Sequence, residues 1–167
     1  SANLLVPEIQ EESSAHLDHL LSIAPVFYNP RMKLNRDIAV LALQVYQNSI
    51  GQKLMICEPM CGTGVRGIRI AKEVDGVERV TMGDLNPQAT KLASFNVEAN
   101  DLKDSVEVRN LEANLLLTLH AVPEKHFSYI DIDPFGSPVY FLDSSIKALK
   151  KGGFLAVTAT DMAPLCG

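Results

Sequence analysis

The chain has 167 residues, of which 47% are hydrophobic and 21% are charged, with a formal net charge of −5. This composition excludes a disordered chain, which would need fewer apolar residues and more net charge, and the length suits one globular domain. The acidic balance, taken alone, argues against a large nucleic-acid surface. No apolar run approaches the roughly 20 residues of a membrane-spanning helix, so we expect no membrane association. Three cysteines cannot form a disulfide framework, which favours a reducing compartment, the cytoplasm or the nucleus.

The first 52 residues are predicted to form a helical and irregular extension. A short helix is predicted over residues 13–22, where leucines share one face, and Pro25 follows it. A second helix is predicted to start near Asn35, because apolar residues then recur at helical spacing.

Residues 53–167 change to a regular alternation of strand and helix patterns, which predicts the core of the protein. Five strands joined by four helical crossovers indicate an α/β fold with a doubly wound, mainly parallel sheet. Such sheets bind ligands at the carboxyl ends of their strands, near the point where the strand order reverses. The predicted strands are 53–58, 79–84, 105–110, 126–133 and 154–160; the predicted helices are 65–74, one starting at Pro87 behind the cap Asn86, 111–121 and 138–150; a turn is predicted at Gly152 and Gly153.

The last predicted strand lies close to Gly167. Its apolar run, residues 154–157, would then sit near an open sheet edge, which native proteins usually protect. We therefore expect a sheet that is truncated after the fifth strand and a chain that is part of a longer protein. The exposed edge could also pair with another chain.

A glycine-rich loop follows the first predicted strand. Gly62, Gly64 and Gly67 match the pattern G-x-G-x-x-G, which permits a tight turn and close approach of a ligand to the backbone. Asp84 ends the second predicted strand, where its carboxylate can accept both ribose hydroxyls of an adenosine. The loop and the acid together predict a cofactor site.

Two cofactors suit this arrangement. A dinucleotide would place its pyrophosphate on the helix N-terminus, whereas S-adenosylmethionine (AdoMet) carries no phosphate. Glu58, four residues before the first glycine, would repel a pyrophosphate but suits a ligand that carries an ammonium and a sulfonium group. AdoMet is therefore favoured over a dinucleotide and over a purely structural turn.

Glu112 and Ala113 follow the third predicted strand and are expected to lie beside the adenine. A carboxylate there can accept the exocyclic amine, and the small alanine leaves room for the ring. The alternative is that Glu112 complements the positive end of the helix that follows it.

The fourth predicted strand ends in Asp133-Pro134-Phe135-Gly136, which points to chemistry on a planar exocyclic amine. The carboxylate can accept the hydrogens of such an amine and remove a proton, and the phenyl ring offers a stacking face for a base. Asp131 alternates with Asp133 along the same strand, and we assign catalysis to Asp133 because it belongs to the motif. The alternative is an ordinary turn, which Asp-Pro and Phe-Gly both favour.

These residues together resemble the Trm1 family of tRNA guanine N2-methyltransferases, which dimethylate guanine 26 of tRNA. The resemblance covers nearly the whole chain. Its motifs are residues 26–30 (VFYNP), 34–37 (LNRD), 62–67 (GTGVRG), 133–136 (DPFG) and 158–167 (TATDMAPLCG).

The resemblance implies the Rossmann-like fold of class I AdoMet-dependent methyltransferases, AdoMet as cofactor and tRNA as partner. It also implies a longer protein, in which a C-terminal domain supplies much of the tRNA surface. It assigns Asp133 as the acid-base group, with Pro134 in the same motif, and Phe135 as the base-stacking residue. The residues that it places at the cofactor site are Phe27, Asn29, Arg36, Arg66, Asp84, Glu112 and Ala113. The loop argument above adds Glu58, Gly62 and Gly64.

Three other functions remain open at this point. A methyltransferase of the same fold could act on another amine, such as adenine N6 or a protein amide. An NAD-dependent oxidoreductase is disfavoured by Glu58, and a non-catalytic fragment could bind AdoMet or RNA or act as a scaffold. We expect no metal site, because Cys57 and Cys61 have poor spacing for a zinc pair and Cys166 has no near partner.

Overall fold

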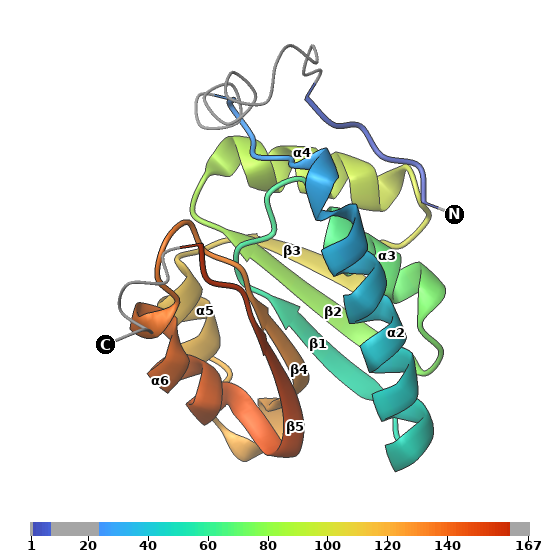
Figure 1. The fold of residues 1–167 in the computed structure, drawn as a ribbon, viewed down its shortest axis with the longest axis vertical. Coiled ribbons are helices and arrows are strands. Elements are labelled where there is room, and N and C mark those ends of the chain that lie inside the picture. Colours follow the sequence, from blue (N-terminus) through green and yellow to red (C-terminus); the bar gives the residue numbers. More distant parts are fainter. Residues whose placement is uncertain (1, 8–23, 161–167) are drawn as a thin grey trace.

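A five-stranded sheet with the order β3-β2-β1-β4-β5 forms the centre of the molecule (Figure 1). The structure, a computed structural model, describes residues 2–7 and 24–160. All four strand pairings in this sheet are parallel, which confirms the predicted doubly wound α/β fold. The strands are β1 (Leu54–Glu58), β2 (Val77–Asp84), β3 (Val106–Asn110), β4 (Phe127–Ile132) and β5 (Leu149–Val157).

Two of the described helices begin behind an asparagine whose side chain caps them. Asn86 caps α4 by accepting a hydrogen bond from Gln88 N at 2.9 Å, with Pro87 in the first position, as predicted. Asn29 caps a short 3-10 helix in the same way, through Arg31 N at 2.9 Å. The described helices are η1 (Pro30–Met32), α2 (Lys33–Ile50), α3 (Val65–Glu73), α4 (Pro87–Glu98), α5 (Ala113–Thr118), η2 (Pro123–Lys125) and α6 (Val139–Ala148).

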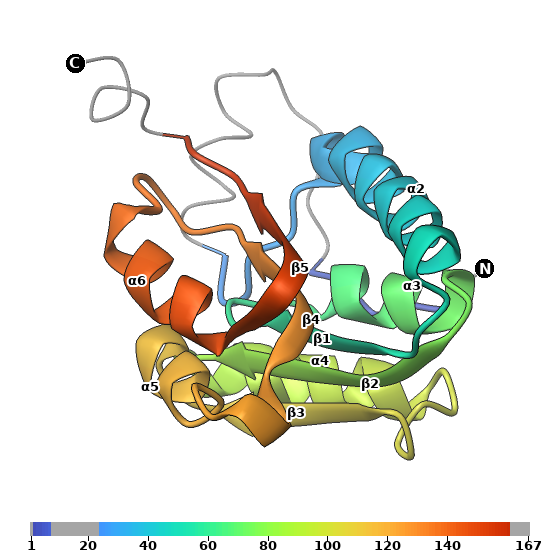
Figure 2. The ribbon, with the colours of Figure 1, turned by 90° about the horizontal axis from the view of Figure 1, so that it is seen from below.

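Helices cover both faces of the sheet, with α2 and α3 on one side and α5 and α6 on the other (Figure 2). Successive strand residues therefore enter different cores. Ile56 packs in the cluster that contains α2, α3 and α4, whereas Cys57 packs in the cluster that contains α5 and α6. Burial on both faces explains why β1 is apolar from Leu54 to Cys57, whereas β4, which is equally buried, also carries Ser128, Tyr129 and Asp131.

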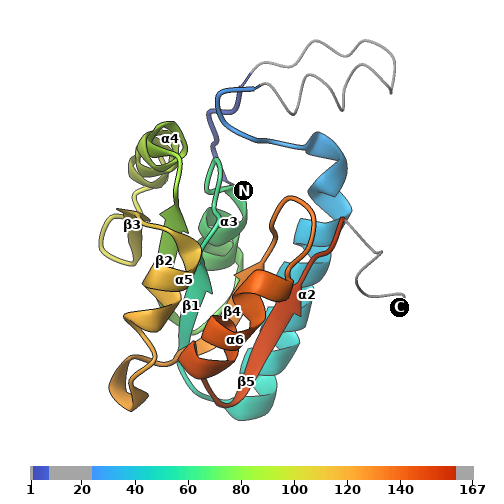
Figure 3. The same cartoon turned by 90° about the vertical axis from the view of Figure 1, so that its left-hand side faces the viewer.

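The chain reverses its direction of winding between β1 and β4, which lie side by side. From β1 the sheet grows through β2 to β3, and from β4 it grows to β5 on the other side. Because the strands are parallel, the carboxyl ends of β1, β2 and β4 meet at one end of the sheet. The segment that precedes α2 passes over this end (Figure 3).

Residues 2–7 lie alongside α4 and are held there by Asn96 of that helix and by Asn100, which lies in the turn after it (Figure 1). Asn96 accepts from Leu5 N at 2.7 Å and donates to Leu5 O at 2.9 Å. Asn100 makes the same two-way contact with the backbone of Asn3. Asn96 also donates to Thr63 O at 2.9 Å, which connects α4 to the glycine-rich loop.

The turn predicted at Gly152 and Gly153 is wrong, because these glycines lie inside β5. The pairing with β4 changes register there: Phe127 pairs with Leu149, and Tyr129 already pairs with Phe154. Gly152 has φ 79°, and the extra residues form an irregularity within the strand. β5 lies at one edge of the described sheet, and its pairing with another chain stays a prediction.

Other predicted boundaries differ by a few residues. The helix predicted over 111–121 is shorter, because α5 ends at Thr118, and the strand predicted from Arg79 already begins at Val77. The helix predicted over 13–22 lies outside the described residues. Within residues 2–7 and 24–160, none of the helices combines the length and apolar character that crossing a membrane requires.

Candidate active site

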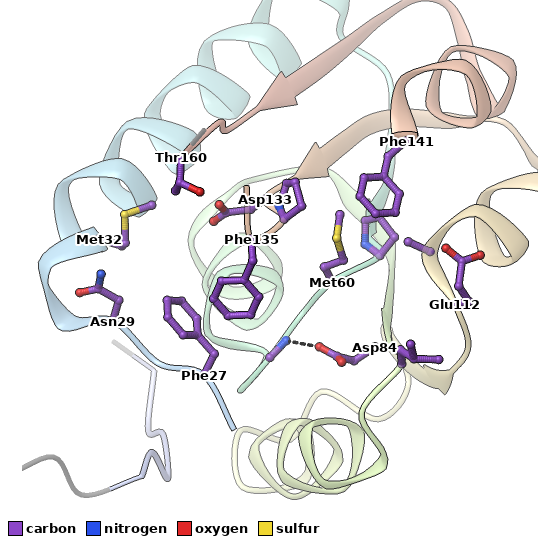
Figure 4. A pocket seen from close by; sticks show the side chains of 15 residues that line it. Phe27, Asn29, Met32, Met60, Asp84, Glu112, Asp133, Phe135, Phe141 and Thr160 are labelled. Atoms are coloured by element: carbon purple, nitrogen blue, oxygen red, sulfur yellow. Dashed lines mark hydrogen bonds between the residues drawn. The ribbon is translucent and has the colours of Figure 1, made fainter. Parts of the chain in front are cut away.

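A cavity of about 320 Å³ lies at the carboxyl ends of β1, β2 and β4. Its walls come from the segment before α2, the loop after β1, the end of β2, the start of α5 and the segment after β4 (Figure 4). A smaller pocket of about 70 Å³ shares Phe27, Gly62 and Asp133 with it. The predicted site residues that line the large cavity are Phe27, Asn29, Gly62, Asp84, Glu112, Ala113, Asp133, Pro134 and Phe135; Arg36, Glu58 and Arg66 line the small one.

Gly64 is the exception, since it lines neither pocket. It takes φ 77° at the start of α3, where a Cβ would lie 3.1 Å from the Cβ of Ala93. In this structure Gly64 therefore lets α3 start close to α4.

The glycine-rich loop is fixed by Asp84 and by the segment that crosses it. Asp84 Oδ2 accepts from Gly62 N at 2.8 Å (Figure 4). Its Oδ1 accepts from Asn86 N at 2.9 Å. A Cβ on Gly62 would lie 3.0 Å from the carbonyl oxygen of Phe27, and Gly62 has φ 52°. Glycine is thus required where the loop turns beneath Phe27.

Gly67 lets the first turn of α3 pack directly on the sheet. A Cβ there would lie 2.4 Å from Met82 Sδ and 2.8 Å from Glu58 Oε2. We expect Gly67→Ala to lower the free energy of unfolding by about 3 kcal/mol, measured by urea titration, because the core around it is closely packed. Gly51→Ala is the control: Gly51 has φ 61° with nothing within 4 Å, so only about 1 kcal/mol of backbone strain is expected. Equal losses in the two variants would contradict the role of close packing.

Three carboxylates surround the buried guanidinium of Arg66. Its Nη2 lies 2.7 Å from Asp133 Oδ2, and its Nη1 lies 3.3 Å from Asp131 Oδ2. Its Nε lies 3.9 Å from Glu58 Oε1, and its Nη1 also donates to Asn35 Oδ1 at 2.7 Å. Burial alone would lower the pKa of Arg66, but the three acids together raise it, so this arginine stays charged.

Glu58 has a raised pKa because it is buried. Burial, aided by the charges of Asp131 and Asp133, raises its pKa to about 8 against the opposing effects of Arg66 and of the hydrogen bond from Gly67 N. That hydrogen bond is 2.9 Å long. Burial therefore favours the protonated form of Glu58 up to a higher pH than for an exposed glutamate.

This shift makes stability depend on pH. A carboxyl group whose pKa is raised on folding stabilises the protein below its unfolded value, and that stabilisation is lost as the pH rises through the folded value, here between about 4.5 and about 8. As the pH rises from about 5 to about 8, we expect the free energy of unfolding to fall less in Glu58→Gln than in the wild type. Urea titration at each pH measures it. Glu73→Gln is the control, because Arg69 lowers the pKa of Glu73 and leaves it ionised throughout that range. An unchanged pH dependence in Glu58→Gln would contradict the buried acid.

Arg36 makes fewer hydrogen bonds to the described residues than Arg66 does. It is 6% exposed, donates one hydrogen bond from Nη1 to Asn29 O at 3.1 Å and lies 5.4 Å from the ring centre of Tyr28. Burial lowers its pKa, and Arg66 nearby adds to this effect. A carboxylate in the small pocket would be a suitable partner for it.

Glu112 caps α5, a role that agrees with its expected interaction with the positive end of this helix. Its Oε1 accepts from Asn114 N at 3.0 Å and its Oε2 accepts from Leu115 N at 2.9 Å. A carboxylate offers about four acceptor positions, so the cap leaves capacity for a ligand in the cavity that Glu112 also lines.

Phe135 stands at the mouth of the cavity and is 76% exposed. It meets Phe27 edge to face, with ring centres 4.8 Å apart (Figure 4). Gly136 N donates to Thr160 Oγ1 at 2.8 Å, which ties the D-P-F-G segment to the residues after β5. Two aromatic rings thus line a space in which a flat ring could stack.

Several residues of the site were not predicted from sequence. The position of Asn35 in the LNRD motif, beside Arg36, could have marked it as a site residue. Its hydrogen bond with Arg66, however, depends on how α2 and α3 pack together. The apolar walls carry no signal in a single sequence; they include Met32, Met60 and Phe141. Within the described residues no cluster of histidine, cysteine and acidic side chains has a metal-binding arrangement.

Comparison with known proteins identifies the relatives of this chain. A family model described as N2,N2-dimethylguanosine tRNA methyltransferase matches residues 5–167. The tRNA (guanine(26)-N(2))-dimethyltransferase of Methanobrevibacter smithii is 45% identical over 150 residues, which cover 90% of this chain and 38% of that protein. The tRNA (guanine(26)-N(2)/guanine(27)-N(2))-dimethyltransferase of Aquifex aeolicus is 38% identical over 167 residues, which cover 99% of this chain and 40% of that protein. The chain thus spans about two fifths of the length of these relatives.

Solved structures agree with this relationship. The complex of Trm1 from Pyrococcus horikoshii with S-adenosyl-L-methionine has a TM-score of 0.79 and 36% identity, and the match covers 99% of this chain and 43% of that one. An O-methyltransferase from Bacillus cereus has a TM-score of 0.63 at 21% identity over 84% of this chain and 61% of that one, a likeness of fold that supports the Rossmann-like class. The chain therefore belongs to the N2,N2-dimethylguanosine tRNA methyltransferase family.

Proposed function

We propose that this chain carries the methyl-transfer site of an AdoMet-dependent tRNA guanine-N2 methyltransferase that dimethylates guanine 26. One observation carries the proposal: acceptors for an adenosine, partners for an amino-acid group and the D-P-F-G motif converge on adjoining pockets at the sheet's reversal point. The relatives named above, which are tRNA dimethyltransferases, support the choice of substrate.

The large cavity suits the adenosine part of AdoMet. Asp84 uses one hydrogen bond on each oxygen for the loop backbone and keeps acceptor capacity for ribose hydroxyls. Glu112 keeps such capacity for the adenine amine beyond its capping bonds, and Ala113 leaves room for the ring.

The small pocket suits the methionyl part. Arg36, which donates from Nη1 to Asn29 O, would hold the carboxylate with donors that bond to none of the described residues, and Glu58 would face the ammonium group. Thr63 Oγ1, which lines this pocket, is buried and has no hydrogen-bond partner among the described residues. An unpartnered buried hydroxyl is costly, and a polar ligand group would satisfy it.

Asp133 would act on the guanine amine. When bound, AdoMet supplies an electrophilic methyl group on its sulfonium sulfur. The guanine N2 lone pair is delocalised into the ring, so a carboxylate that accepts its hydrogens orients the nitrogen and raises its electron density. As the N–C bond forms and the S–C bond breaks, Asp133 can take one N2 proton. After one transfer N2 keeps a hydrogen, so the same group can act a second time.

Phe135 would receive the target base. A guanine inside an RNA stack cannot reach the cavity, so it must be splayed or flipped out. The exposed ring of Phe135, backed by Phe27, offers it a stacking surface worth roughly 1–3 kcal/mol per base.

Two candidate functions compete with this proposal. The D-P-F-G chemistry also suits another exocyclic amine, and the chain by itself could bind AdoMet without turnover. Mass analysis of nucleosides from tRNA incubated with the full gene product and AdoMet tests the first alternative. We expect dimethylguanosine at position 26, and the formation of methyladenosine instead would contradict guanine as the target. Calorimetry with AdoMet and NAD on the 167-residue chain tests the cofactor, and binding of NAD alone would overturn it.

The extension before residue 53 belongs to the proposed site rather than to a separate function. Phe27, Asn29, Met32 and Arg36 all line the pockets. A tRNA substrate places the protein in the cytoplasm or the nucleus, and we include that location in the proposal.

A further inference from the structure

Two polar side chains of β4 lie beneath the proposed catalytic carboxylate without touching the cavity. Tyr129 is 0% exposed and Asp131 is 3% exposed, and neither lines either pocket. They are two residues apart on one strand, so they face the same side of the sheet. The Tyr129 hydroxyl donates a short hydrogen bond to Asp131 Oδ2.

Arg66 connects this buried pair to Asp133. One terminal nitrogen of its guanidinium lies 3.3 Å from Asp131 and the other lies 2.7 Å from Asp133. The guanidinium is a rigid plane, so its orientation at one acid sets its orientation at the other. Asn35 holds the same plane from α2 at 2.7 Å.

We propose that Tyr129 is a positioning residue for methyl transfer, because its hydroxyl, acting through Asp131 and Arg66, fixes the carboxylate of Asp133. This inference rests on the proposed function of Asp133. Tyr129 touches neither cofactor nor base.

The alternative is that Tyr129 only fills the core. Its ring does pack there, with its centre 5.6 Å from that of Phe154. A phenylalanine would fill that space equally well without placing a hydroxyl in an apolar interior, where each polar group must be paired. The hydroxyl instead takes the one Asp131 oxygen that also faces Arg66.

The charges around Asp131 give this role a distinctive pH dependence. The groups that face Asp131 are Arg66 from α3, Tyr129 and Asp133 from its own chain segment, and Glu58 from β1. Burial raises the pKa of Asp131, whereas Arg66 and the Tyr129 hydrogen bond hold it down. Without the hydroxyl, Asp131 takes up a proton at higher pH and loses its attraction for Arg66.

The test compares Tyr129→Phe with the wild type in the full gene product, by methyl transfer into tRNA. We expect kcat to fall about tenfold near neutral pH, with KM for AdoMet within about twofold, and the acidic limb of the kcat profile to move to higher pH. Tyr46→Phe is the matched control, because its hydroxyl donates to Gly152 O, away from both pockets.

The Asp133→Asn variant separates the proposed function of Asp133 from the proposed positioning role of Tyr129. A wild type that never methylates guanine contradicts the proposed function itself. An active wild type with an inactive Asp133→Asn variant, but a Tyr129→Phe variant with unchanged kcat and pH profile, overturns only the present inference. A lower melting temperature with an unchanged pH profile overturns it as well, since core filling alone predicts that result.

If Tyr129→Phe does not fold, Asp131→Asn takes its place. Reduced kcat at unchanged AdoMet affinity then supports the inference, and unchanged kcat overturns it.

Discussion

Asp133→Ala should abolish methyl transfer to tRNA in the full gene product while leaving AdoMet binding largely intact. Removing a general base and amine acceptor is expected to cost about a hundredfold to ten-thousandfold in turnover. Arg66 keeps Asp131 and Asn35 as partners in that variant, so the pocket should hold its shape. Transfer of labelled methyl groups measures turnover, and calorimetry measures cofactor affinity.

The control for this variant is Asp143→Ala on the neighbouring helix α6. The Asp143 side chain is 82% exposed and pairs only with Lys147 among the described charges. Its removal should leave turnover unchanged, because exposed ion pairs contribute little. Wild-type turnover in Asp133→Ala would refute the assignment of the acid-base group.

Asp84→Ala should produce the largest loss of cofactor affinity. The change removes the proposed ribose acceptor and also frees Gly62 N and Asn86 N, which hold the glycine-rich loop and the start of α4. Hydrogen bonds to charged groups are worth about 1.5–3 kcal/mol each, so we expect AdoMet affinity to fall roughly tenfold to a hundredfold in calorimetry on the 167-residue chain.

Asp104→Ala offers the same change of charge at an exposed position and should leave AdoMet affinity unaltered. Thermal unfolding of both variants separates loss of the ligand contact from loss of the fold. If Asp84→Ala binds AdoMet as tightly as the wild type, the adenosine end of the cavity has been placed wrongly.

The fold was predictable because its signals are local and repeat along the chain. Apolar runs between turn residues mark strands buried on both faces, and the Asn86-Pro87 pair marks the start of α4. The irregularity at Gly152 was not predictable, since it depends on how β5 pairs with β4. Two adjacent glycines indicate a turn when the partner strand is unknown.

In the candidate site, too, local features were predictable from the sequence and contacts between distant elements were not. The parallel order brings the predicted acids at the strand ends together around one cavity, as the sequence indicated for Asp84, Glu112 and Asp133. The contact of Arg66 with Asp131 depends on how α3 is rotated on the sheet, and no spacing in the sequence carries that information. For the same reason the capping role of Glu112 and its proposed ligand role could not be separated by position alone.

The pairing of Asn96 and Asn100 with residues 2–7 has a consequence for which positions can vary. Their hydrogen bonds to Asn3 and Leu5 involve only the backbone amides and carbonyls of those two residues, which are spaced as on the edge of a strand. Substitution at Asn3 or Leu5 leaves those groups in place for any residue except proline, which has no N–H. Position 96 on α4 and position 100 in the turn after it have no such freedom. No other side chain both donates and accepts at that length and shape except glutamine, which is one methylene longer. Variation among related sequences should therefore be tolerated at residues 3 and 5 and resisted at 96 and 100.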